Sequence, residues 1–97
     1  MSKMDEQINE TLIYVGKKLR TERERLRITR EHMELITAIS VDTIKRIEAG
    51  KSSSIENVLR MAAALHMPFS LLFPAQPRGK YVIRQEIDRL LDELSEE

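Results

Sequence analysis

The chain contains no cysteine and no tryptophan, and only three glycines, three prolines, two phenylalanines and two tyrosines among its 97 residues. The lack of cysteine excludes a disulfide framework, a thiolate zinc site and a cysteine nucleophile, and it fits a reducing compartment. The longest stretches without charge, such as Met61 to Phe73, are shorter than the ~18 apolar residues that span a bilayer. The N-terminus has no basic start followed by an apolar run, so we expect a cytoplasmic protein with no membrane segment.

Acidic and basic residues balance at 16 each, but they are distributed unevenly. Residues 1–79 carry 13 Lys and Arg against 10 Asp and Glu, whereas residues 80–97 carry three against six. Residues 17–51 alone hold ten basic and six acidic side chains. The middle of the chain is therefore suited to meeting phosphate, and the acidic tail is not. On composition alone, a solvated face of mixed charges explains the same excess equally well.

Long alternating runs of β-branched residues are missing, so the sequence predicts an all-α fold. Apolar residues recur at steps of three, four and seven over about residues 5–26, which predicts a first helix with one buried stripe. Thr29 and Ser40 are suitable N-caps for two short helices, the first over about 30–36 and the second ending near Gly50. About four residues separate these two helices, which is the length of the turn in a DNA-reading helix-turn-helix.

Two further segments follow in the second half of the chain. Ser53 and Glu56 form a capping box that predicts a fourth helix over about 54–65, followed by a short apolar turn over 69–73. A Pro- and Gly-containing linker over 74–80 then leads to a last helix over 81–97 with an acidic polar face. Its apolar stripe consists of Ile83, Ile87, Leu90, Leu91 and Leu94. We expect this stripe to dimerise against the same helix of a second chain, and folding back on its own domain is the alternative.

Residues 39–51 read ISVDTIKRIEAGK and follow the stretch ITREHME at 28–34. Together they resemble the phage-repressor family of helix-turn-helix proteins, which are Cro- and lambda-repressor-like or Xre-type, with its tail T-I-x-R-I-E-x-G-K. The match extends back to Gly16 and Leu19 and forward to Leu72 and Phe73. The resemblance implies a five-helix, lambda-repressor-like DNA-binding domain over 13–73. It leaves 1–12 as an extension of the first helix, 74–80 as a linker and 81–97 as a dimerisation helix.

In that family the second short helix lies in the major groove and contacts base edges. The resemblance therefore implies base contacts from Val41, Asp42, Thr43, Lys45 and Arg46. Arg46 is the main candidate for specificity, because a guanidinium can donate two hydrogen bonds to guanine O6 and N7. Val41 suits a thymine methyl group. Asp42 either accepts from cytosine N4, rejects wrong sequences, or makes a contact at the helix N-terminus.

Phosphate contacts need hydrogen-bond donors at the edges of the groove. The resemblance implies that Arg30 and Lys51 supply them, and small hydroxyl side chains near helix starts add neutral donors. The full set of expected phosphate contacts is Thr29, Arg30, Ser40, Lys51, Ser52 and Ser53. An exposed polar side chain without a ligand is the alternative for each. Arg23 and Glu48 occupy positions that form a partly buried ion pair in many family members, so their expected role is structural.

The sequence departs from the family pattern at the first short helix and the turn after it. Glu34 stands where a small residue is usual, so its carboxylate needs a partner or access to solvent. Ala38 stands where glycine usually adopts a left-handed conformation, which costs a residue with a Cβ about 1 kcal/mol or more. Leu35 and Ile36 fall on positions that are usually polar, and they form either an exposed patch for a partner or an unusual part of the core.

Residue patterns for catalysis are missing. The two histidines lie in different predicted helices without metal-ligand spacing, and there is no Gly-rich loop or nucleophile elbow, so we expect no enzyme, cofactor or metal. The leading expectation is a homodimeric transcriptional regulator, acting as a repressor, that binds a palindromic operator in double-stranded DNA through residues 41–48. One alternative is an antitoxin-type autorepressor that also binds a protein partner. Another is a protein-interaction adaptor without DNA binding.

Overall fold

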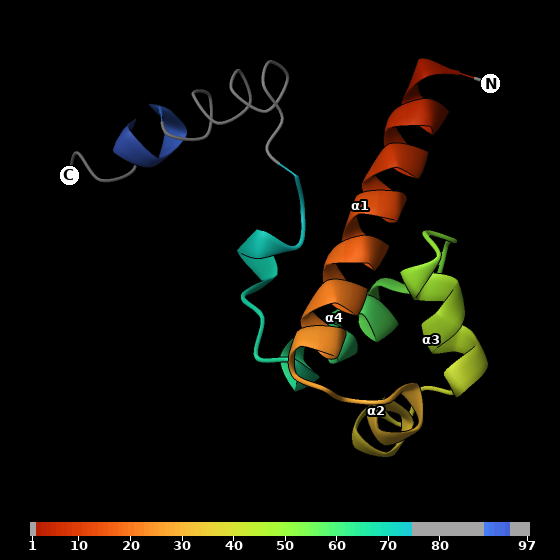
Figure 1. Ribbon diagram of the computed structural model, residues 1–97. Helices are drawn as coiled ribbons and strands as arrows, with labels where there is room; N and C mark the ends of the chain where they lie inside the picture. Colours follow the sequence, from red (N-terminus) through yellow and green to blue (C-terminus); the bar gives the residue numbers. More distant parts are fainter. Residues whose placement is uncertain (1, 75–88, 94–97) are drawn as a thin grey trace.

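The computed structural model describes residues 2–74 and 89–93, and all regular structure in these residues is helical, which confirms the predicted all-α class. The elements are α1 (Lys3–Arg25), α2 (Arg30–Thr37), α3 (Val41–Glu48), α4 (Ile55–Ala64) and a 3-10 turn, η1 (Phe69–Leu71). Residues 89–93 are also helical. Helices α2, α3 and α4 gather around the C-terminal half of α1, whose first turns extend beyond them (Figure 1).

A hydroxyl side chain begins each of the helices α1 to α4 and accepts a hydrogen bond from a backbone N–H of the first turn. The predicted N-caps Thr29 and Ser40 are confirmed, because they accept from the backbone of His32 and Thr43 at 3.0 and 3.2 Å. Ser2 caps α1 in the same way. These local bonds set the starting points of α2 and α3, and hence the length of the turn between them.

The predicted capping box at the start of α4 is wrong. The N-cap is Ser54, whose hydroxyl accepts from the backbone N–H of Asn57 at 3.1 Å. Ser53 lies one residue too early, and its hydroxyl accepts instead from the side-chain amide of Asn57 at 3.5 Å. Glu56 pairs with Arg60 one turn further along the helix, with 2.9 Å between the charged atoms. Three consecutive serines left the sequence with several possible caps, and the backbone uses the last.

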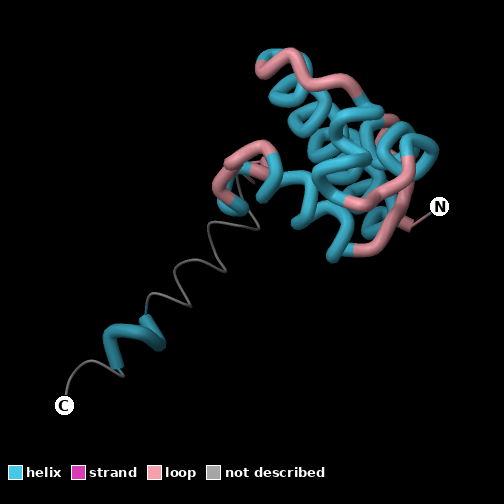
Figure 2. The backbone as a smooth tube through the Cα atoms, turned by 90° about the horizontal axis from the view of Figure 1, so that it is seen from below, coloured by secondary structure: helices cyan, strands magenta, loops and turns pink. Residues whose placement is uncertain are grey.

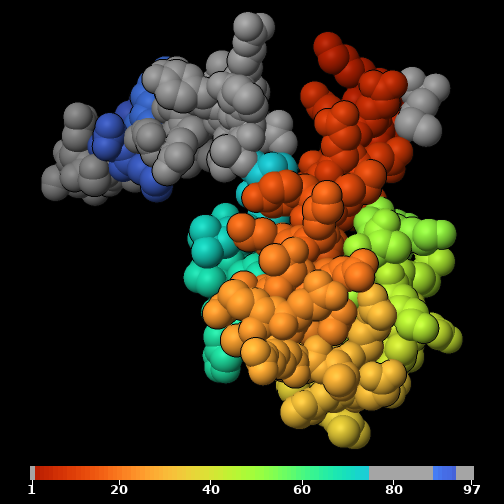
Figure 3. Space-filling model, in the orientation of Figure 1, coloured from red at the N-terminus to blue at the C-terminus, as the bar shows by residue number. Residues whose placement is uncertain are grey.

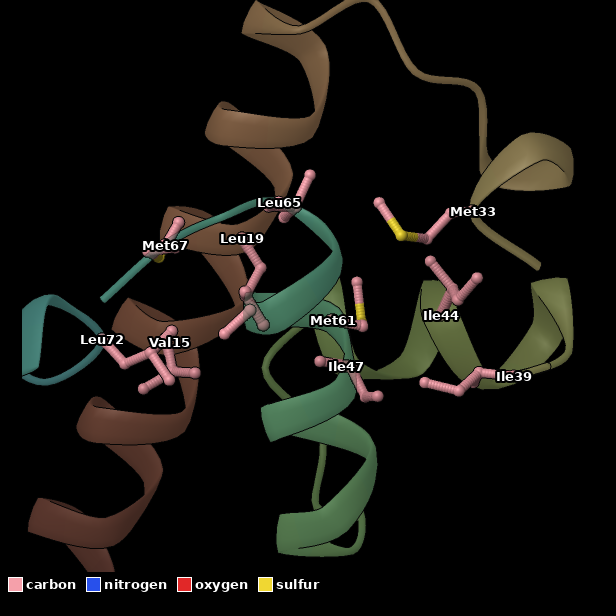
Figure 4. Close-up of a cluster of buried hydrophobic side chains, with 11 residues drawn as sticks. Val15, Leu19, Met33, Ile39, Ile44, Ile47, Met61, Leu65, Met67 and Leu72 are labelled. Carbon is pink, nitrogen blue, oxygen red and sulfur yellow. The ribbon is translucent and has the colours of Figure 1, made fainter. Parts of the chain in front are cut away.

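The hydrophobic core gathers side chains from α1, α2, α3 and α4, and from the segments that follow α2 and α4, around the C-terminal half of α1 (Figure 4). Burial of these apolar surfaces is the main favourable term in folding. Leu19, Met33, Ile44 and Met61 are fully buried and connect α1, α2, α3 and α4. The whole buried cluster consists of Val15, Leu19, Met33, Ile39, Ile44, Ile47, Met61, Ala62, Leu65, Met67 and Leu72.

The apolar stripe predicted for the first helix is buried over only part of its length. Val15 and Leu19 are in the core, whereas Ile8 is 49% and Leu26 is 39% exposed. For Ile8 the physical reason is the extent of the domain, because α2, α3 and α4 do not reach the first turns of α1 (Figure 1), whereas Leu26 is the C-cap at the other end of the helix. Of the predicted C-terminal stripe, Leu90 and Leu91 are exposed, and Ile83, Ile87 and Leu94 lie outside the described residues, as does most of the predicted linker.

Candidate nucleic-acid interface

Helices α2 and α3 are joined by a turn of three residues with a fixed backbone. Ala38 ends α2 in the left-handed conformation, at φ 62° and ψ 21°, and its N–H donates to the carbonyl of Glu34 at 2.8 Å. The hydroxyl of Thr37 donates to the carbonyl of Met33 at 2.7 Å and accepts from the backbone N–H of Ile39 at 3.2 Å. The conformation expected at Ala38 is therefore present, and these bonds hold the direction in which α3 leaves the turn.

Helix α3 has one face buried in the domain and another directed outward. Ile44, Ile47 and Glu48 are buried. The expected base-contacting residues share the other side of the helix: Asp42, Lys45 and Arg46 are exposed, and Val41 and Thr43 are half-buried. Arg46 is exposed and takes part in no ion pair among the described residues. The helix therefore presents a mixed polar surface from a position that its apolar side fixes.

Glu48 connects the end of α3 to two arginines from other parts of the fold. Its side chain is only 2% exposed, and it accepts from Arg23 through two bonds, Nε to Oε2 at 2.7 Å and Nη2 to Oε1 at 3.1 Å. Arg30 donates from Nε to Oε1 at 3.0 Å. The hydrogen-bonded carboxylate raises the pKa of Arg23 above its usual value. Arg23 also donates from Nη1 to the carbonyl of Ile28 at 2.8 Å. Each of the three guanidinium nitrogens therefore has a hydrogen-bond acceptor in this buried site.

The first turn of α3 carries a second carboxylate contact that the sequence did not specify. Glu34, from α2, accepts a hydrogen bond from the backbone N–H of Val41 at 3.3 Å, while the side chain stays exposed. A carboxylate at a helix N-terminus is favourable because the backbone N–H groups there carry partial positive charge. Arg60 was also not anticipated, and it donates from α4 to the carbonyl of Thr37 at the end of α2, at 3.3 Å.

The residues expected to contact phosphate fall into two groups. Lys51, Ser52 and Ser53 are exposed in the connection between α3 and α4, close in sequence to the end of α3. Thr29, Arg30 and Ser40 have structural contacts of their own. Thr29 and Ser40 are helix caps, and the Arg30 side chain is 29% exposed while its Nε is bonded to Glu48.

Two positions on α2 that the sequence offered as a patch for a protein partner, Leu35 and Ile36, are 83% and 50% exposed.

Two further observations limit the site. Among residues 2–74 and 89–93, no group of three or more His, Cys, Asp and Glu side chains is placed to hold a metal ion. None of the helices in the same residues combines the length and apolar character needed to cross a membrane.

Comparisons with protein-family models, with curated proteins and with solved structures give no match for this chain.

Proposed function

We propose that this protein is a sequence-specific DNA-binding transcriptional regulator, acting as a repressor, that reads a palindromic operator as a dimer through residues 41–48. The observation that carries the proposal is the exposed face of α3. Arg46 and Lys45 point outward from a helix whose opposite face is anchored by Ile44, Ile47 and the buried Glu48. Together with the motif at 39–51, this supports a lambda-repressor-like domain over residues 13–73.

In this proposal α3 enters the major groove, which is wide enough for one α-helix. Arg46 lies one turn after the first residues of the helix and donates to guanine O6 and N7, and Lys45 and Thr43 donate nearby. Val41 contacts a thymine methyl group, and Asp42 accepts from cytosine N4. The three hydrogen bonds that Arg23 and Arg30 donate to Glu48 keep α3 from rotating, so the outward residues meet base edges in one register.

Phosphate contacts flank the groove in the same arrangement. Lys51, Ser52 and Ser53 follow α3 and are exposed, so they can donate to the backbone of one strand. Arg30 uses Nε for Glu48, which leaves its terminal amino groups for a phosphate on the other side. Thr29 and Ser40 contribute through their helix starts, where backbone N–H groups favour anions. These contacts position the domain and carry no sequence information by themselves.

A palindromic operator is expected because the proposed regulator binds DNA as a two-fold symmetric dimer. A two-fold symmetric dimer places two recognition helices in successive major grooves, about 34 Å apart along the duplex. The C-terminal segment 81–97 is the proposed dimerisation element, and its described members Leu90 and Leu91 are exposed and apolar. The protein would then repress transcription by occupying the operator.

The exposed pair Leu35 and Ile36 supports a second candidate, an antitoxin-type autorepressor that also grips a protein partner. Large apolar side chains gathered on one surface often mark a contact site. A Leu35→Glu variant that keeps DNA binding but no longer copurifies with a partner protein supports this candidate.

The remaining alternative is a protein-interaction adaptor without DNA binding. In that case Arg46→Ala leaves the activity of the protein unchanged.

The experiment that tests the main proposal is selection from a randomised duplex library at two salt concentrations. We expect a palindromic motif to be enriched, with affinity that falls steeply as salt rises, because bound Lys and Arg side chains release counterions from DNA. The spacing of its two halves would give the distance between the recognition helices. Failure to enrich any sequence at low salt contradicts the proposal.

A further inference from the structure

One apolar stripe runs along α1, and only its C-terminal half is covered. Val15 and Leu19 lie in the core, whereas Met4 and Ile8, which helical spacing places on the same side, are 68% and 49% exposed. Leu12 lies between them and is half-buried. Figure 3 shows the first turns of α1, in red, standing beyond the body of the domain. We call Met4, Ile8 and Leu12 the α1 stripe.

The α1 stripe has the form of a docking surface rather than of scattered apolar residues. It borders a hollow on the helix surface, and the described residues that line this hollow are Met4, Gln7, Ile8, Thr11 and Leu12. Of the charged residues of the same turns, Lys3, Glu6 and Glu10 fall on other sides of the helix by their spacing, and Asp5 borders the stripe. A second helix with an apolar face would therefore find a continuous apolar seat here.

The other end of the chain presents a second uncovered apolar surface. Leu90 and Leu91 are 48% and 57% exposed. Figure 1 and Figure 2 both place Arg89–Glu93 apart from α1, so within one chain these leucines do not cover the α1 stripe. The sequence predicts that they belong to a longer stripe, from Ile83 to Leu94. One copy of the chain thus carries two apolar helix faces, each without a partner among the described residues.

The two stripes are similar in spacing, and the C-terminal one is the longer. From Met4 to Leu12 the chain advances by eight residues, about 12 Å along a helix, and from Ile83 to Leu94 by eleven residues, about 16 Å. Both stripes repeat at steps of three and four, so a helix predicted over 81–97 would present an apolar seam like the one on α1. A helix with the predicted C-terminal stripe can therefore cover the whole exposed part of α1.

We propose that the C-terminal segment 81–97 of one copy packs on the α1 stripe of a second copy, and that the contact is reciprocal. A reciprocal exchange buries two helix-on-helix contacts in each dimer, whereas pairing two C-terminal helices, or two α1 helices, buries one. Stable interfaces usually bury at least ~1,200 Å² in total, which favours the larger contact. This inference uses the dimer of the proposed function but not its DNA binding.

Charge gives the contact a recognisable salt dependence. Residues 81–97 carry six acidic and two basic side chains, and residues 3–12 carry three acidic and one basic. The two surfaces repel each other electrostatically while their apolar faces attract, so added salt should strengthen the dimer by screening the repulsion. DNA binding should respond to salt in the opposite sense. The two processes can thus be separated by one variable.

Disulfide crosslinking in the full chain tests the proposal, because the natural sequence has no cysteine. The substitutions are Ile8→Cys, at the middle of the α1 stripe, and Leu90→Cys, near the middle of the C-terminal stripe. Ile8 stands opposite Leu90 if the two helices run antiparallel, and opposite Ile87 if they run parallel, so Ile87→Cys is tested in the same way. Chains with Ile8→Cys are mixed with size-tagged chains carrying Leu90→Cys, without DNA, and oxidised. A disulfide requires Cα atoms within about 7 Å, so a mixed crosslink reports direct contact between copies.

We expect the mixed crosslink to form faster than either self-crosslink. Crosslinking of Leu90→Cys only with itself would overturn the inference in favour of paired C-terminal helices, and leave the dimer of the proposed function intact. A third variant carries both Ile8→Cys and Leu90→Cys in one chain. If its disulfide forms only within one chain, the inference is overturned, because the C-terminal segment then folds back on its own α1. A chain that is monomeric at all concentrations would overturn both this inference and the proposed dimer.

A second measurement uses charge instead of cysteine. Ile8→Glu should raise the dissociation constant of the dimer by at least ~10-fold, because each dimer contains the contact twice and a carboxylate is costly at an apolar seam. Ile55→Glu at the start of α4 is the matched control, since Ile55 is 63% exposed but lies outside both stripes, and it should leave the constant unchanged. Equal dissociation constants for wild type and Ile8→Glu, by sedimentation, would also overturn the inference.

Discussion

Gly16 of α1 lies directly against the carbonyl oxygen of Ile47 in α3. A Cβ at Gly16 would stand 2.2 Å from that oxygen and 2.9 Å from the carbonyl oxygen of Glu48. Both contacts are with backbone, which cannot turn aside as a flexible side chain can. The missing side chain at this position is therefore what allows α1 and α3 to pack this closely. The relationship fixes the depth at which α3 sits on the domain.

A Gly16→Ala substitution should consequently force the two helices apart. We expect it to lower the free energy of unfolding by about 1–3 kcal/mol, the usual cost of overpacking, despite the better helix propensity of alanine. Thermal or urea unfolding measures the effect. Lys17→Ala, at the next and exposed position of α1, is the control and should change stability little. A Gly16→Ala protein as stable as wild type would contradict the close approach.

Ala38 and Ala63 should respond in opposite directions to the same substitution. Ala38 has a left-handed backbone at φ 62°, which glycine adopts without strain, so Ala38→Gly should stabilise the fold by roughly 0.5–1 kcal/mol. Ala63 lies within α4 and is exposed, so Ala63→Gly should destabilise by about 0.5–1 kcal/mol. Unfolding curves of both variants are compared with wild type. Changes of the same sign at the two positions would contradict this account.

The sequence predicted those parts of the fold that local chemistry determines. Thr29 and Ser40 could be identified as caps, because a cap depends on the side chain and the next three residues. The left-handed turn at Ala38 followed from its place in the motif. At the start of α4, local chemistry was ambiguous, since three adjacent serines offer equivalent hydroxyl groups, and the prediction chose the wrong one.

Other features depend on contacts between distant parts of the chain and could not be predicted. Periodicity showed that Ile8 belongs to an apolar stripe, but not that the domain ends before reaching it. The sequence suggested no partner for the carboxylate of Glu34, which bonds to Val41 seven residues away. It also did not show that Arg30 would share Glu48 with Arg23. For that reason Arg30 has a structural contact as well as its proposed one with phosphate.

Removal of the buried carboxylate tests how much the connection between α1, α2 and α3 stabilises the fold. Glu48→Ala leaves Arg23 buried without its partner, so we expect a loss of about 3–5 kcal/mol in unfolding free energy. Glu48→Gln should lose less, because an amide oxygen still accepts a hydrogen bond. Glu56→Ala is the control, since Glu56 pairs with Arg60 at the exposed surface and should contribute little. Similar melting temperatures for Glu48→Ala and Glu56→Ala would contradict the structural role.

Arg46 and Lys51 should differ in how they affect DNA binding if the proposed function is correct. Arg46→Ala should cost about 1–3 kcal/mol on the selected operator and relax the preference at one base pair in each half-site. Lys51→Ala should weaken binding to all duplexes to a similar extent and make the salt dependence less steep. Both residues are exposed, so thermal stability should be unchanged. Anisotropy titrations with the operator and its single-base variants measure these effects, and an unaltered profile for Arg46→Ala contradicts base reading by Arg46.

Glu34 offers a test of whether the start of α3 approaches phosphate. Its carboxylate accepts from the backbone N–H of Val41 at 3.3 Å, and an amide oxygen in Glu34→Gln can accept the same bond. The substitution therefore keeps the contact and removes one negative charge from the proposed DNA-facing end of the helix. We expect DNA affinity at low salt to rise by about 2- to 10-fold, and the gain to shrink at high salt because screening weakens the repulsion that was removed.

Glu6→Gln supplies the matched control for that measurement. Glu6 is also exposed, but it lies in the first turns of α1, at the end of the molecule away from α2 and α3 (Figure 1). Each variant changes the net charge of the chain by the same amount, so a general effect of charge would raise both affinities equally. Both are measured at protein concentrations where the chain is fully dimeric, because Glu6 belongs to the acidic turns of the proposed dimer contact. A gain confined to Glu34→Gln identifies the α3 N-terminus as the part that meets the phosphate backbone. Equal affinities for the two variants would mean that DNA, if bound, meets another surface.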